Sequence, residues 1–171
     1  MNSLASALVF CLLLTPQTGK VGEVESDVDK SANFSALHTY AWSKGHDAFE
    51  PKAHQAIVAE VEKQMTALGF KQAPAASADV LLTYHTVRGS ELDLKKLDEL
   101  LKKEDQATAT KQATRILGHL ALVMSNPSTR AKVWSAGTRR RLSDDPAKWN
   151  TELHDAVTAL FATYPGAKKA K

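Results

Sequence analysis

The chain has 171 residues, of which 43% are hydrophobic and 24% charged, as is usual for a single globular domain. A chain of this length can bury about 70% of the surface that its unfolded form exposes, so it needs no disulfide or metal ion to fold. The net charge is only +3, and the basic triplet at residues 139–141 and the basic C-terminus supply much of it. This composition excludes a wholly disordered or fibrous chain and does not indicate a nucleic-acid partner.

The first distinctive segment is the apolar run at residues 4–14 (LASALVFCLLL). It has the length of the hydrophobic region of a signal peptide and is shorter than the roughly 20 residues of a membrane-spanning helix. We therefore expect residues 1–19 to be a signal peptide, with a cleavage site that the sequence does not define. The mature protein would be periplasmic or secreted, without a stable transmembrane span and with association to the envelope left open. An uncleaved N-terminal anchor is the alternative.

The single cysteine, Cys11, lies within this apolar run, so the mature chain is expected to contain no disulfide. Lipid attachment at Cys11 would require a small residue immediately before it, and Phe10 occupies that position. The sequence therefore does not favour a lipoprotein.

Residues 20–165 are expected to form a single α+β domain, followed by a flexible basic tail at residues 166–171. The first half of this domain alternates strands with one helix. Residues 21–28 and 34–42 predict a half-buried strand and a loop followed by a short β segment. Pro51 can begin a helix and Gly69 can end it in the left-handed conformation. Residues 79–87 then predict a central strand, parallel to the strand before the helix.

The second half begins with an insertion. Ser90 and Asp93 form a capping-box pattern that predicts a charged amphipathic helix to about residue 104, and residues 105–114 either continue it or form a mobile linker. Residues 116–124 and 132–142 predict an antiparallel hairpin. Asp145 and Pro146 can begin the last helix, whose expected apolar stripe consists of Trp149, Leu153, Val157, Leu160 and Phe161.

These elements predict a single mixed β-sheet of about four to five strands. Two main helices would pack on one face of the sheet, and the charged amphipathic helix would be an insertion. Such a sheet has a second, uncovered face. If Leu81, His85 and His119 line it, they would form a binding surface for an apolar ligand or a partner protein.

Catalytic motifs are not evident in this sequence. His85 and His119 could be neighbours on one sheet face, but they would supply two metal ligands without an evident third. The mature chain has no Gly-x-Ser-x-Gly elbow, no Gly-rich phosphate loop and no nucleophilic cysteine. We therefore predict no catalytic residue, no metal site and no cofactor, and we expect the protein not to be an enzyme. Leu81, His85 and His119 remain the candidate ligand-binding residues.

Five short segments of the chain occur in an order and at a spacing that together indicate a particular protein family. They are residues 33–42 (NFSALHTYAW), Gly69 with Phe70, residues 78–85 (ADVLLTYH), residues 132–137 (KVWSAG) and residues 156–161 (AVTALF) before Tyr164 and Pro165. Together they resemble the bacterial envelope family catalogued as domain of unknown function 4136. This chain departs from that family at residues 91–114, which are longer and more charged than the expected connector, and at Ser125 and Asn126, where such proteins commonly carry an acidic residue.

The resemblance implies an exported protein, often a lipoprotein, with helices packed on one mixed sheet and no established activity. We therefore expect an exported envelope protein that acts as a non-enzymatic binding or interaction module. Its partner would be an envelope protein or a small ligand, contacted through the open sheet face or the charged insertion. The alternatives are a periplasmic carrier of a small apolar ligand and, more remotely, a His-dependent enzyme or metal site.

Overall fold

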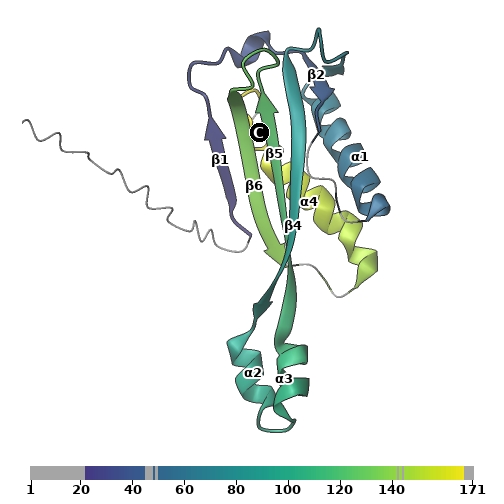
Figure 1. Cartoon of the computed structure of the whole chain (residues 1–171), viewed down its shortest axis with the longest axis vertical. Coiled ribbons are helices and arrows are strands. Elements are labelled where there is room, and N and C mark those ends of the chain that lie inside the picture. The colour runs from purple at the N-terminus through teal and green to yellow at the C-terminus, as the bar shows by residue number, and fades with distance from the viewer. Residues whose placement is uncertain (1–21, 45–47, 49, 142, 144, 168–171) are drawn as a thin grey trace, which may run out of the picture.

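A computed structural model describes residues 22–44, 48, 50–141, 143 and 145–167 (Figure 1). The expected signal peptide at residues 1–19 lies outside these described residues, as do residues 168–171 of the expected basic tail.

The described part of the chain forms one six-stranded sheet with four α-helices. The strands lie in the order β1-β6-β5-β4-β2-β3, and the sheet is mixed because β2 runs parallel to β3 and β4 while the other pairs are antiparallel. The strands are β1 (Val24–Val28), β2 (Thr39–Trp42), β3 (Lys71–Gln72), β4 (Val80–Leu92), β5 (Thr114–Ser125) and β6 (Lys132–Arg141). The helices are α1 (Pro51–Ala67), α2 (Leu94–Leu100), α3 (Gln106–Ala113) and α4 (Trp149–Phe161), with 3-10 turns at Phe34–Ala36 and Pro146–Lys148.

The α+β class, the mixed sheet, the parallel β2–β4 pair and the β5–β6 hairpin are confirmed. The expected number of four to five strands is wrong by one. The missed strand is β3, which has two residues and pairs with β2 directly after α1. A two-residue strand is too short to show an alternating pattern.

The two long helices, α1 and α4, pack side by side on one face of the sheet (Figure 1). Even-numbered residues of the central strands point towards these helices, since side chains alternate along a strand. They bury a single core, in which Trp134, Leu82, Leu122 and Met124 are fully inaccessible and meet Val61, Met65, Val157 and Leu160 of the helices. Each such side chain contributes about 1.5–3 kcal/mol through burial, so this layer fixes which face of the central strands points towards the helices.

A partly buried carboxylate joins the N-terminal ends of the parallel strands β2 and β4. Asp79 Oδ2 accepts hydrogen bonds from the backbone N–H groups of His38 at 2.9 Å and Thr39 at 2.8 Å, and from the Thr39 hydroxyl at 2.8 Å. These bonds lower the pKa of the Asp79 carboxyl. The ionised carboxylate therefore ties together segments that are 40 residues apart in sequence.

The end of α1 follows the sequence prediction. Gly69 has φ +87°, and the Phe70 N–H donates to the Met65 carbonyl at 2.9 Å, which is the hydrogen bond of a Schellman ending. Phe70 is buried in the core. Gly69 thus turns the chain back so that β3 can pair with β2.

Replacement of Gly69 by valine is predicted to lower the free energy of unfolding by about 1 kcal/mol or more, because a β-branched residue resists positive φ. The matched control is Gly89→Val in β4, where φ is not positive and an added Cβ meets no atom within 4 Å. Urea unfolding of both variants is the measurement. Equal stabilities would contradict the assigned role of Gly69.

The insertion between β4 and β5 differs from the single helix that the sequence predicts. β4 continues through Ser90 to Leu92, so the expected capping box is wrong and Asp93 alone caps α2, accepting a hydrogen bond from Lys96 N at 3.1 Å. α2 ends at Leu100, and residues 106–113 form a second helix, α3, capped by Asp105. We call residues 90–116 the arm, because here β4 and β5 continue past the end of β6 and carry α2 and α3 away from the rest of the domain (Figure 1).

The start of α4 also differs from the prediction. The Asp145 carboxylate accepts a hydrogen bond from Ala147 N at 3.0 Å and so caps the 3-10 turn, while α4 itself begins at Trp149. Trp149 is 44% exposed and its indole N–H donates to the Ser143 carbonyl, so it does not belong to the apolar stripe. The other expected members, from Leu153 to Phe161, do pack on the core.

Candidate binding surface on the open face of the sheet

The face of the sheet opposite α1 and α4, called the open face here, carries no helix of the described residues. Strand register places its side chains in rows that cross the sheet. One row contains His85, Ala121, Gly137 and Glu25, which are successive partners across β4, β5, β6 and β1. The next contains Val87, His119 and Arg139.

These rows surround an open hollow of about 190 Å³. Its floor is low because the two central residues are small: a Cβ added to Gly137 would lie 3.7 Å from the Ala121 Cβ. Longer side chains stand around this floor. The residues lining the hollow are Glu23, Glu25, His85, Val87, His119, Leu120, Ala121, Gly137, Thr138 and Arg139.

The charges around the hollow are segregated by strand. Glu23 and Glu25 come from β1 and the residue before it, whereas Arg139 comes from β6. Partial burial, together with the nearby Arg139 guanidinium, lowers the pKa of His119 below its ordinary value. His119 is therefore neutral at pH 7 and can both donate and accept a hydrogen bond.

The three residues predicted from the sequence all lie on the open face, but in two places. His85 and His119 both line the hollow, on adjacent strands and one row apart. Leu81 lies further along β4, where it is only 3% exposed and is buried with Ala41, Ala78 and the partly buried Ala73. The structure thus brings the two histidines together and covers Leu81 with the segment before β4.

The chemistry available at this surface is recognition by hydrogen bonds and charges around an apolar floor. Among the described residues, no group of three or more His, Cys, Asp or Glu side chains is arranged to hold a metal ion. Likewise, no helix in the described part of the chain is long and apolar enough to cross a membrane.

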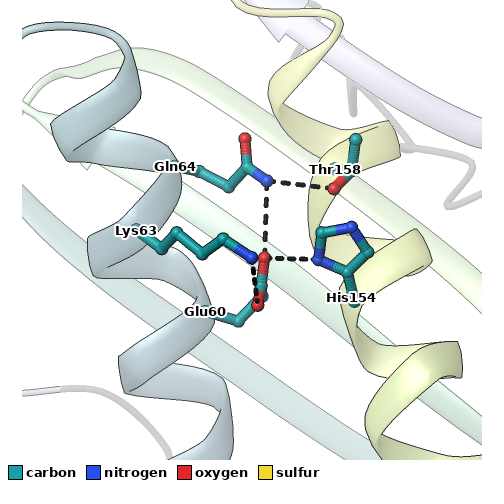
Figure 2. Close-up of polar contacts among 5 residues, drawn as sticks. All are labelled: Glu60, Lys63, Gln64, His154 and Thr158. Carbon is teal, nitrogen blue, oxygen red and sulfur yellow. Dashed lines mark hydrogen bonds and ion pairs between the residues drawn. The ribbon is translucent and has the colours of Figure 1, made fainter.

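A second polar cluster joins the two long helices (Figure 2). Glu60 of α1 contacts His154 of α4, with 2.7 Å between Oε1 and Nδ1, and it also contacts Lys63 at 3.8 Å. Gln64 donates to the Thr158 hydroxyl at 3.0 Å. Because every contact lies within or across the α1–α4 packing, this cluster holds the helices in register.

This cluster was not predicted from the sequence, although a signal was present. Glu60 and Gln64 are four residues apart on α1, and His154 and Thr158 are four residues apart on α4, so each pair lies on one helix face beside the apolar stripe. Matching the two pairs required knowledge that α1 and α4 are neighbours. Periodicity within one helix does not give that information.

The fold is therefore that of an α+β domain in which α1 and α4 cover one face of the sheet and the other face is open. The chain belongs to the family described as "Domain of unknown function (DUF4136)", whose model matches residues 24–166. This confirms the resemblance seen in the sequence. The search of curated proteins gave no match.

Solved structures share the fold at low identity. A PDZ domain protein from Parabacteroides distasonis has a TM-score of 0.57 and 16% identity; the match covers 85% of this chain but only 36% of that protein. A single-residue variant of the PelC dodecamer from Paraburkholderia phytofirmans and the PelC dodecamer itself each have a TM-score of 0.52, at 14% and 12% identity. They match 82% of this chain and 97% and 94% of the PelC chains. These likenesses concern the fold alone.

The lowered pKa of His119 predicts a pH dependence of stability. Since the unfolded chain binds the proton more readily than the folded chain, stability is complete above the ordinary His pKa of about 6.5 and falls as the pH drops below it. His119→Asn should therefore reduce the loss of unfolding free energy between about pH 7.5 and pH 5, as measured by urea unfolding at both pH values. An unchanged loss in the variant would show that His119 is not held in its neutral form.

Proposed function

We propose that this chain is an exported, non-enzymatic interaction module of the bacterial cell envelope that binds a protein partner through the open face and the arm. The observation that carries the proposal is the position of the exposed large apolar side chains. Among the described residues, all but one of these side chains lie there: Val87 on the open face, which is 61% exposed, and Leu92, Leu94 and Leu101 on the arm. The exception is Trp149 on α4. Exposed apolar side chains grouped on one region of a domain are typical of a docking surface.

The volume of the open hollow favours a protein partner over a carried small ligand. At about 190 Å³ it is smaller than the ~300–1,000 Å³ typical of small-molecule sites. A second hollow, beside Leu68 and Phe161 on the α1–α4 side, has about 280 Å³ and is also below that range. Segregated charges around an apolar centre resemble the polar rim and apolar core of a protein interface.

Family membership and fold likeness support the proposal indirectly. The DUF4136 match agrees with the envelope family that the sequence resembles, and the apolar run at residues 4–14 supports export. The PelC structures are described as dodecamers. A related fold can therefore present surfaces that assemble, and we carry this property over to the present chain as part of the proposal.

The test is retention of a partner from an envelope extract by the full chain, expressed with a C-terminal tag and recovered from the periplasmic fraction. Val87→Lys/Leu94→Lys should reduce retention at least about tenfold, because both side chains would lose apolar contact with the partner. The matched control is Ala59→Lys/Thr151→Lys, which adds the same charges at exposed positions of α1 and α4.

Two results would contradict the proposal. One is recovery of the unprocessed chain in the cytosol. The other is equal retention by the surface variant and the control, since binding would then not involve the open face or the arm.

A further inference from the structure

The arm ends in an apolar stripe that its own helices leave exposed. Leu94 is 67% exposed and Leu101 is 46% exposed, and their spacing of seven residues places them on one side of α2. Leu97 and Leu100 are half-buried, and on α3 the fully buried residues are Ala109 and Ala113. The short helical hairpin therefore buries one side of α2 and leaves the other free to contact another surface.

A carboxylate interrupts this stripe. Asp98 follows Leu94 by four residues and precedes Leu101 by three, so it lies between them on the same side of α2. A charged carboxylate in the middle of the stripe opposes insertion into a lipid surface, where the buried side of a helix is apolar. The stripe therefore fits a protein surface that offers both apolar and basic groups.

The arm has equal numbers of basic and acidic residues, and most of the acids lie before or after α2, where they form ion pairs or hydrogen bonds. Glu91 pairs with Arg141, and Asp93 caps α2 and pairs with Arg115. Glu104 accepts from Gln112, and Asp105 caps α3. The exposed charges on α2 and directly after it are four lysines, which outnumber the two exposed acids there: Lys95, Lys96, Lys102 and Lys103 against Asp98 and Glu99.

The hollow on the open face has the complementary pattern. Ala121 and Gly137 form its floor, and Glu23 and Glu25 lie on one side of it. Arg139 lies on β6, the strand between β1 and β5. The apolar floor matches the exposed leucines, the glutamates match the lysines that flank them, and Arg139 matches Asp98. Complementary charges of this kind determine which surfaces dock and in which register.

These two surfaces cannot meet within one chain. From Val87, which lines the hollow, β4 runs five residues further to Leu92 before α2 begins, a distance of about 17 Å along the strand. Figure 1 shows α2 and α3 beyond the end of β6, directed away from β1.

We propose that α2 of one copy of this chain docks on the hollow of a second copy. This inference rests on the proposed interaction function and names the partner. The exposed side of α2 lies over Ala121 and Gly137 of the neighbouring copy, and Lys95 and Lys102 face its Glu23 and Glu25. Such a contact joins different surfaces of two copies. Either two chains each dock their arm on the other, or the contact repeats from chain to chain around a ring.

The test reverses the charges on each surface separately. Lys95→Glu/Lys102→Glu makes both surfaces of a chain acidic, and Glu23→Lys/Glu25→Lys makes both basic. Each variant alone should therefore associate at least about tenfold more weakly than the native protein in sedimentation velocity. An equimolar mixture should regain association, because each arm then meets a hollow of opposite charge. The control is Lys52→Glu/Lys71→Glu, which alters exposed lysines outside the arm and should associate like the native protein.

Three outcomes would overturn the inference: a native protein that is monomeric at all concentrations, association that the arm variant leaves unchanged, or a mixture that does not recover. Binding of the native monomer to phosphatidylcholine–phosphatidylglycerol vesicles would identify the partner as a lipid surface instead. Retention of a different envelope protein by a monomeric chain would overturn only this inference and leave the proposed function standing.

Discussion

The structure depends on the fact that a sheet has two faces and that the two long helices cover only one of them. α1 and α4 pack on each other and on the even-numbered residues of β4, β5 and β6. The orientation of these three strands follows from this contact, because a shift of one residue would exchange the buried and exposed side chains. The odd-numbered residues are then left on the open face, where the register brings His85, His119 and Arg139 around a floor of small side chains.

The arm is a consequence of unequal strand lengths. β4 and β5 pair over twelve residue positions, and their last pairs lie beyond the final residue of β6. The ribbon therefore leaves the layer that the long helices stabilise, and its tip is held by local interactions: the caps at Asp93 and Asp105, the pairing of Asp93 with Arg115, and the buried Ala109 and Ala113. Local contacts suffice to form α2 and α3, but they do not cover Leu94 and Leu101. An extended element with an uncovered apolar side is suited to contact another molecule.

Much of this fold was predictable from local chemistry. Gly69, Pro51 and the alternating strand residues each act within a few positions, and the structure has them as predicted. The predictions were wrong where segments distant in sequence determine the local structure. β3 exists only because Gly69 returns the chain beside β2, and Ser90 belongs to β4 because β5 offers a partner at Ile116. On the open face, alternation predicted that His85 and His119 could be neighbours. It did not reveal the acidic side formed by Glu23 and Glu25, because that side comes from a segment distant in sequence. It also did not reveal the cover over Leu81, because periodicity within β4 does not show how the segment before the strand folds back.

The claim that one face of the sheet is covered and the other open can be tested by substitutions at two adjacent residues of β5. Ala121 lines the hollow, whereas Leu122 is fully buried against the helices. Ala121→Gln and Leu122→Gln introduce the same polar side chain on opposite faces of one strand. In urea unfolding of dilute protein, Ala121→Gln should change the unfolding free energy by less than about 0.5 kcal/mol and Leu122→Gln should lower it by about 3 kcal/mol or more. Equal losses at the two positions would mean that both faces of the sheet are buried, and would contradict the open face.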